Sequence, residues 1–247
     1  WFGKKLFRRQ NRRVHLTRTG QHLYSHLNEL FHELSDICQR TKASVHNNQL
    51  TVGCIPSIAT RWLIPNLSDF SNSHPNINLQ VLYAQADNQL TDGDYDVLIT
   101  MGEDKSAHVV SEKLFSRATR PVCNPKFFAD SSGLHKVSEI ANSQLLHDET
   151  KEAWKEWLSK AGLDIDLTPT GPVYQDMNLL ITAVIAGHGI ALCPLDIYRE
   201  EIARGDLVVL SEVETNQDKG YYITSETERN QAAEAFIDWF KYLTLPK

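Results

Sequence analysis

An uninterrupted helical pattern near the start of the chain most strongly constrains its fold. No Gly or Pro occurs between Gln21 and Val52, and Thr17 is a suitable N-cap for the helix that follows it. Apolar residues recur in steps of four and three, a heptad seam formed by Leu23, Leu27, Leu30, Leu34 and Ile37. A helix of about 24 residues is about 36 Å long and needs a partner for such a seam. We expect dimerisation through these five residues; packing on the chain's own body is the alternative.

Charge is distributed unevenly along the 247 residues. The first 20 residues carry seven Lys and Arg and no Asp or Glu, whereas the remainder carries 18 basic and 31 acidic side chains. Two short strands, Leu6–Arg9 and Arg13–Leu16, are predicted around a turn at Gln10–Arg12. Such a basic arm on an acidic body commonly contacts phosphate backbones, although a solvated charged end is the alternative. The expected DNA contacts are Lys4, Lys5, Arg8, Arg9, Arg12 and Arg13.

From Gln49 onward, short apolar segments alternate with helical patterns, which is typical of an α/β protein with largely parallel sheets. The expected strands are Leu50–Ile55, Ile77–Tyr83, Tyr95–Thr100, extended segments within Val109–Cys123, then Gln144–His147, Gly171–Tyr174, Ile190–Leu192, Leu207–Leu210 and Gly220–Thr224. The expected helices are Ala59–Phe70, a short polar helix after Tyr83, then Pro125–Ala129, Val137–Ala141, Glu152–Ala161, Met177–Ala186, Leu195–Ala203 and Gln231–Leu243.

Composition and spacing exclude several classes of protein. With 41% hydrophobic and 23% charged residues, the chain is neither disordered nor fibrous. No apolar run approaches about 18 residues, so no membrane partner is expected, and no secretory signal is visible. The four cysteines are far apart and form no CxxC pair, which favours reduced thiols and a cytoplasmic location.

No catalytic or metal-binding constellation stands out. His22 and His26 have a chelating helical spacing but no evident third ligand. Asp92–Glu103 mimics calcium-loop spacing without the required glycine, and Gly187–Gly189 follows a helix instead of opening one. We therefore expect no metal, no cofactor and no enzymatic activity.

An ordered set of short motifs resembles the LysR-type transcriptional regulators. Leu16–Gly20 resembles the L-T-x-x-G end of the family's wing, and Ala186–Pro194 resembles its late A-G-x-G-I-A-L-x-P segment. Further matching segments, in order, are Leu50–Gly53, Trp62–Pro65, His74–Pro75 and Asp96–Ile99. Arg61–Pro65 and Trp154–Gly162 look most like the branch that contains the glycine-cleavage activator and the β-lactamase regulator AmpR.

The resemblance implies an α/β fold with a two-lobed effector domain like that of periplasmic binding proteins. A long linker helix and the wing of a winged helix-turn-helix would precede this domain. The implied divisions are a wing remnant at 1–17, a linker (dimerisation) helix at 18–46, lobe I at 49–122 with 221–247, and lobe II at 123–220. The family's helix-turn-helix lies before the wing, so we expect about 40 to 50 further residues ahead of residue 1 in the native protein.

A ligand cleft between the lobes follows from the resemblance and from residue chemistry. Ser57 to Thr60 stand between a strand and a helix N-terminus, where free amides suit a carboxylate. Most other candidates follow strand ends, where open α/β sheets bind ligands, and Tyr221 is implied by the resemblance. The full candidate set is Ser57, Ile58, Thr60, Gln85, Thr100, Met101, Gln175, Asp176 and Tyr221. Helix capping or packing is the alternative for each of them.

Together these features predict a DNA-binding transcriptional regulator that senses a small polar molecule, such as an amino acid, a carboxylate or a peptide. Its expected partners are promoter DNA, the effector and further copies of itself, as a dimer or a tetramer. DNA reading would need the missing N-terminal helices. The main alternative is a solute-binding protein of the same two-lobe fold.

Overall fold

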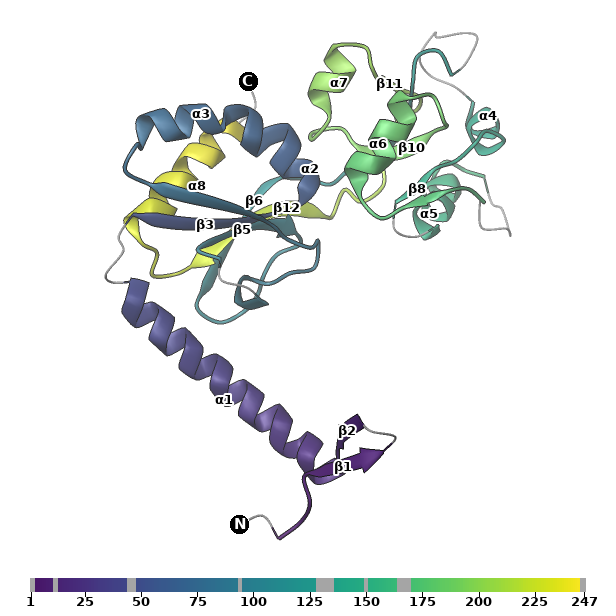
Figure 1. The fold of residues 1–247 in the computed structure, drawn as a ribbon. Helices are drawn as coiled ribbons and strands as arrows, with labels where there is room; N and C mark the ends of the chain where they lie inside the picture. Colours follow the sequence, from purple (N-terminus) through teal and green to yellow (C-terminus); the bar gives the residue numbers. More distant parts are fainter. Residues whose placement is uncertain are drawn as a thin grey trace. The chain divides into compact units, whose positions relative to one another are not determined.

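The computed structural model describes residues 3–10, 13–43, 48–92, 95–127, 136–148, 151–163 and 170–244. The chain forms two compact units, Trp1–Asn47 and Asn48–Lys247 (Figure 1). No helix in the described residues combines the length and apolar character needed to cross a membrane.

The first unit is a hairpin followed by a long helix, as the sequence predicts. Strands β1 (Phe7–Gln10) and β2 (Arg13–Leu16) pair antiparallel, and helix α1 spans Arg18–Ala43. Thr17 is the N-cap: its hydroxyl oxygen accepts from the Gly20 N–H at 3.1 Å and donates to the Lys5 carbonyl at 2.8 Å. A Cβ at Gly20 would lie 2.0 Å from the Leu6 carbonyl oxygen, so only glycine allows the helix to approach the hairpin this closely.

A five-stranded sheet, the first sheet, lies at the centre of one half of the second unit. Its strands, in spatial order, are β4 (Asn78–Tyr83), β3 (Gln49–Cys54), β5 (Val97–Met101), β12 (Gly220–Glu226) and β6 (Val109–Ser116). Strand β3 runs parallel to β4 and β5, whereas β12 runs antiparallel to β5 and β6. Helices α3 (Ile64–Ser73) and α8 (Gln231–Thr244) pack together on it through Phe70 and Phe236, whose rings are 5.4 Å apart (Figure 1).

A second, antiparallel sheet organises the other half of this unit. It contains β10 (Ala191–Pro194), β7 (Thr119–Cys123) and β11 (Val208–Val209), while β8 (His147–Asp148) and β9 (Val173–Tyr174) form a separate parallel pair. Its helices are α4 (Val137–Ala141), α5 (Glu152–Lys160), α6 (Met177–Ile185) and α7 (Arg199–Ala203). Two buried tryptophans hold α5 in place: the indole N–H of Trp154 donates to the Leu146 carbonyl at 2.8 Å, and that of Trp157 to the Val213 carbonyl at 2.9 Å.

Several predicted elements are corrected by the structure. Neither large sheet is largely parallel: the first is mixed, because β12 returns from the second half and inserts between β5 and β6, and the second is antiparallel. Residues 125–127 form a turn where a helix was predicted, and residues 128–129 lie outside the described residues. Among the described residues between Tyr83 and β5, the expected polar helix is represented by the short 3₁₀ turn Leu90–Asp92, and the helix predicted from Leu195 begins at Arg199.

The predicted helix Ala59–Phe70 has a different start and a wide turn. It begins at Pro56 with the short α2 (Pro56–Ile58), and the π-helical turn η1 (Ala59–Leu63) connects α2 to α3. The Ile64 N–H donates to the Ala59 carbonyl, five residues back. Pro65 explains the wide turn, because proline has no N–H to donate and its ring would clash with an α-helical carbonyl four residues earlier.

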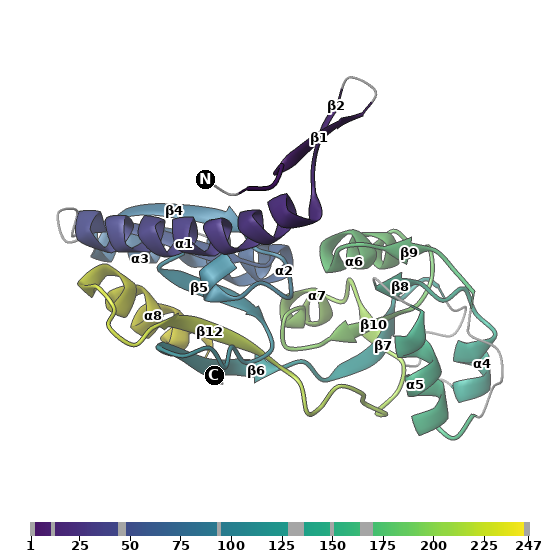
Figure 2. The ribbon, with the colours of Figure 1, turned by 90° about the horizontal axis from the view of Figure 1, so that it is seen from below.

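Two chain crossings connect the sheets, one from β6 to β7 and one from β11 to β12 (Figure 2). They are hydrogen-bonded to each other: the Arg117 N–H donates to the Lys219 carbonyl at 3.1 Å, and Thr119 and Thr215 exchange backbone bonds of 2.9 and 3.1 Å. The hydroxyls of Thr119 and Thr215 are also 2.9 Å apart, and both residues are buried. We refer to this ladder as the paired crossovers.

The paired crossovers give a test of the fold. Thr215→Val should lower the free energy of unfolding by about 1–3 kcal/mol, because it leaves the buried Thr119 hydroxyl without its threonine partner. The double variant Thr119→Val/Thr215→Val should lose less than the sum of the two single variants, since both hydroxyls are then gone. Urea unfolding of the four proteins measures this; strictly additive losses would show that the hydroxyls do not interact.

Candidate functional site

The helix that begins at α2 lies in the half organised by the first sheet, and α6 lies in the half organised by the second. The N-terminal ends of these two helices contact each other directly. The Thr60 hydroxyl lies 3.1 Å from the Asn178 side-chain oxygen and 2.9 Å from the Pro56 carbonyl, two acceptors that share its single proton. Ser57 and Ile58, in the first turn of the same helix, are buried. The structure therefore brings three predicted ligand residues of the first sheet's half next to the start of α6.

Asp176 and Gln175 precede α6 on the opposite side of this contact. The Asp176 carboxylate accepts from the N–H groups of Asn178 at 2.8 Å and Leu179 at 3.3 Å, so it caps the helix. Capping was the alternative role considered for this residue, and the structure shows it. Gln175 is exposed.

The remaining predicted ligand residues do not all converge on this point. Met101 and Tyr221 are direct cross-strand partners, and the buried Tyr221 ring lies 5.6 Å from Phe115. Thr100 pairs with Tyr222 and points, by strand alternation, to the opposite face of the sheet. Gln85 is exposed after β4, where its N–H donates to the Asn88 side chain at 2.7 Å.

Sequence reasoning missed a polar contact between η1 and α7. Arg61 Nε lies 2.6 Å from the Glu201 carboxylate, whose side chain is only 5% exposed, and the guanidinium sits 5.4 Å from the centre of the Tyr198 ring. Arg199 stacks on Trp62 at 4.0 Å. The partners are about 140 positions apart in the sequence, so no local pattern could have revealed them.

Buried phenol and thiol groups of the second unit stay protonated. Burial raises the pKa of the Tyr198 phenol; the nearby Cys193 raises it further, and the Arg61 charge opposes this. Burial also raises the pKa of Cys54 and Cys193, and that of Cys123 to about 11. These three cysteines are free and buried, so they offer no thiolate for nucleophilic chemistry. Among the described residues, no three His, Cys, Asp or Glu side chains could hold a metal ion.

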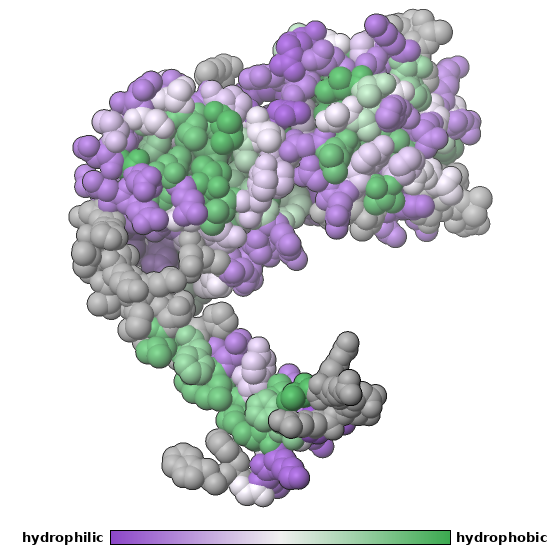
Figure 3. All heavy atoms as spheres, in the orientation of Figure 1, coloured by the Kyte–Doolittle hydropathy of each residue, from purple (hydrophilic) through white to green (hydrophobic). Residues whose placement is uncertain are grey.

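The predicted DNA-binding and dimerisation residues lie in the first unit. Lys4, Lys5 and Arg8 are exposed; Arg9 and Arg13 lie in the strands but their side chains, like all of Arg12, are outside the described residues. Along α1 the apolar seam is uncovered, with Leu27, Leu30 and Leu34 between 41% and 59% exposed (Figure 3).

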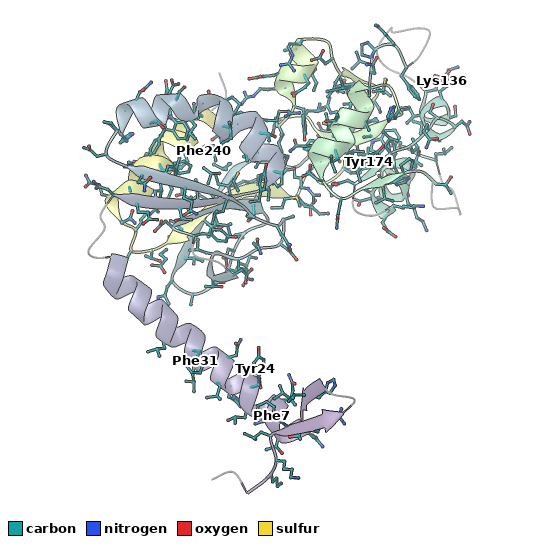
Figure 4. The ribbon with its side chains drawn as sticks, in the orientation of Figure 1. Phe7, Tyr24, Phe31, Lys136, Tyr174 and Phe240 are labelled. Carbon is teal, nitrogen blue, oxygen red and sulfur yellow. The ribbon has the colours of Figure 1, made fainter. Side chains whose placement is uncertain are left out.

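The seam of α1 is wider than the heptad positions alone. Tyr24 and Phe31 extend it and are 55% and 65% exposed (Figure 4). Leu23 is half-buried, and the Ile37 side chain lies outside the described residues. A contiguous exposed apolar surface of this kind is typical of a protein interaction site.

The buried His147 gives the second unit a predicted pH dependence. Its ring is 1% exposed, and neither nitrogen has a well-aligned hydrogen-bond partner among the described residues. Burial lowers its pKa below the ordinary 6.5, with the Thr170 backbone opposing and the Lys151 charge adding to the effect. Below pH 6.5 the unfolded chain takes up a proton that the folded chain does not, so stability falls as pH falls through this range.

We expect His147→Gln to flatten the loss of unfolding free energy between pH 7 and pH 5. Urea unfolding at several pH values measures the slope, and the exposed His188→Gln serves as the matched control. A wild-type slope in His147→Gln would contradict this assignment.

Comparison with known proteins identifies relatives across the whole chain. The model of the LysR substrate binding domain matches residues 43–243. The glycine cleavage system transcriptional activator of Escherichia coli (strain K12) is 30% identical over 242 residues, which are 97% of this chain and 79% of that protein. A carbapenem-hydrolyzing beta-lactamase transcriptional activator of Serratia marcescens is 28% identical, covering 96% of this chain and 81% of that protein.

Solved structures share the fold. The effector domain of the transcriptional regulator AmpR of Pseudomonas aeruginosa superposes with a TM-score of 0.68 at 24% identity, over 80% of this chain and 96% of that chain. CrgA, a LysR-type transcriptional regulator from Neisseria meningitidis, gives a TM-score of 0.68 at 18% identity, over 99% of this chain and 85% of that chain. The relatives named here are transcriptional regulators and not enzymes, in agreement with the absence of enzymatic activity expected from the sequence. The chain belongs to the LysR family of transcriptional regulators and carries its substrate-binding, or effector, domain.

Proposed function

We propose that this chain comprises the wing, the dimerising linker helix and the effector domain of a LysR-type regulator that binds a small polar molecule between its two sheets. The proposed divisions are 1–17, 18–46, lobe I at 49–122 with 221–247, and lobe II at 123–220. The observation that carries the proposal is the meeting of two helix starts from different sheets, at the Thr60–Asn178 hydrogen bond.

The chemistry at this meeting point suits an amino acid, a carboxylate or a peptide-like molecule. Ser57 and Thr60 supply hydroxyls beside free amides of the first helical turn, where a carboxylate is favoured. Asp176 and Gln175 supply acceptors for a ligand amine from the other side. A ligand that binds here changes the balance between two arrangements of the sheets only if it has different affinities for them.

The names of the relatives favour a regulator over a solute-binding protein of the same fold. The glycine cleavage and β-lactamase proteins are described as transcriptional activators. The exposed Lys4, Lys5 and Arg8 of the hairpin are suited to phosphate contacts, which position a protein on DNA without reading its sequence. Dimers, paired further into tetramers, would present two such hairpins or more to promoter DNA.

A thermal-shift screen against amino acids, small carboxylates and cell-wall peptides tests the ligand site. A ligand at 100 times its Kd adds about 2.7 kcal/mol of stability. For any ligand found, Ser57→Ala should weaken binding about tenfold, because it removes a hydrogen-bond donor at the first helical turn. The exposed Ser71→Ala, in the same helix, should bind as the wild type does. Equal affinity in Ser57→Ala would remove this residue from the site.

The seam of α1 makes a separate prediction about assembly. Leu27→Glu/Leu30→Glu should convert dimers into monomers, because each copy would place two charges against an apolar partner surface. Ser25→Glu, at an exposed position on the opposite face of α1, should leave the dimer intact. Sedimentation equilibrium decides this, and a wild-type chain that is monomeric at micromolar concentration would refute dimerisation through α1.

A further inference from the structure

The wide turn η1 and helix α7 contact each other across the two halves of the second unit. Helix α7 lies on the side of its half that faces α2 (Figures 1 and 2). Arg61 in η1 reaches Glu201 in α7, with 2.6 Å between Arg61 Nε and the nearer carboxylate oxygen. In the other direction, Arg199 at the start of α7 stacks on the Trp62 ring at 4.0 Å. Each element therefore places one arginine on the other.

The Glu201 carboxylate is the buried charge of this contact. Its side chain is 5% exposed, whereas that of Arg61 is 26% exposed. Arg204 is a second cation nearby, 3.8 Å from the same carboxylate oxygen, but it is 56% exposed and bonds to Asp206 at 2.9 Å. Arg61 is therefore the main compensation for a carboxylate that has been removed from water.

The cluster around this ion pair is incompletely hydrogen-bonded. Arg61 Nε, the second carboxylate oxygen of Glu201 and the Tyr198 hydroxyl are buried, and none has a well-aligned hydrogen-bond partner among the described residues. The Arg61 guanidinium lies 5.4 Å from the centre of the Tyr198 ring, so the three groups belong to one cluster. Buried polar groups without partners cost free energy that water would recover. The charge pairing thus favours this contact, and the unmet hydrogen bonds oppose it.

The two halves also share an apolar cluster, which includes Ile58 and Ile181. Apolar contacts are non-directional, so they oppose full separation without fixing one angle between the halves. An ion pair with a planar guanidinium fork is directional. The Arg61–Glu201 pair therefore selects one arrangement among those that the apolar cluster allows.

Arg61 also contacts the proposed effector site. Its Nη1 donates to the Thr60 hydroxyl at 3.4 Å, and the same hydroxyl lies 3.1 Å from the Asn178 side chain. Arg61 thereby links α7 to the point where the two helix starts meet. A ligand that takes the Thr60 oxygen as its partner removes one contact of Arg61 and changes its hold on Glu201.

We propose that Arg61 and Glu201 form a latch, which holds the two halves in the arrangement of this structure and releases when occupancy of the effector site changes. Arg61 is a positioning residue, because it acts through Thr60 and Glu201. In the latched arrangement it compensates the buried carboxylate; in the released one, water hydrates both side chains and the Tyr198 hydroxyl. The role of the latch in sensing rests on the proposed function, whereas its test needs no ligand.

Distances between spin labels on the two halves test the latch. Nitroxides are attached at Ser71→Cys in α3 and Ser159→Cys in α5, which are exposed positions in different halves. The cysteines at 54, 123 and 193 are buried, and Cys38→Ser is included in every protein. A large excess of unlabelled chain restricts the pulsed resonance measurement to distances within one chain.

Arg61→Gln should lower the ratio of the wild-type distance to a second distance by about tenfold or more, because Glu201 is left buried without its main cation. Arg61→Gln/Glu201→Gln should return to the wild-type distribution, since no uncompensated charge remains. Glu112→Gln is the matched control: it breaks the ion pair with Lys241 inside the half of the first sheet, and it should keep the wild-type distribution.

A wild-type distribution in Arg61→Gln would overturn the latch. So would a double variant that stays displaced, or a Glu112→Gln variant that shifts as far as Arg61→Gln does. Circular dichroism shows whether each variant is folded. If Arg61→Gln does not fold, Arg61→Lys replaces it, with an expected change of about threefold, because the ammonium keeps the charge but lacks the planar fork. Ser57→Ala reports on the ligand site alone, so the latch and the proposed function can fail separately.

Discussion

The arrangement of the second unit depends on the hydrogen-bonded ladder between its two chain crossings. Because Thr119 pairs with Thr215 and Arg117 with Lys219, the chain returns to the first sheet beside the place where it left. That return sets the direction of β12, which fills the position between β5 and β6 and completes the sheet. Helix α8 follows and closes the core through Phe236. Sheet order, strand direction and core closure all follow from this one short ladder.

One hydrophobic cluster contains residues of both halves, among them Ile58 and Ile181, and three polar contacts also join the halves. Thr60 bonds to Asn178, Arg61 pairs with Glu201, and Arg199 stacks on Trp62. Breaking an apolar interface exposes surface that water cannot satisfy, whereas a hydroxyl or guanidinium can take water or a ligand as its next partner. The Glu201 carboxylate is the exception, because it is buried and would lose much of its compensation if Arg61 moved away. The halves are thus joined by a shared apolar cluster, by one buried ion pair, and by two polar contacts whose groups could take water or a ligand instead.

Local sequence patterns predicted most of the helices and strands. Contacts between residues far apart in the sequence determine how these elements pair and which side chains meet. The basic hairpin, the Thr17 cap and the long α1 all follow from periodicity and capping within a few residues of each other. Asp176 was predicted either as a cap or as a ligand contact, and only the structure shows that its carboxylate caps α6. The antiparallel β12 and the Arg61–Glu201 pair depend on residues about 100 or more positions apart. Pro65 is a local signal for the wide turn at η1, but the apolar periodicity that predicted the helix does not reveal it.

Helix α1 also has a mechanical consequence. Its 26 residues make a rod of about 39 Å at the ordinary rise of about 1.5 Å per residue. The cap at Thr17 and the close approach at Gly20 clamp one end of this rod to the hairpin, so the hairpin turns when the helix turns. As a lever arm, the rod converts a rotation of about 5° at its far end into a displacement of about 3.4 Å at the hairpin, the length of one base-pair step. A small tilt of α1 is therefore enough to move the hairpin by several ångströms.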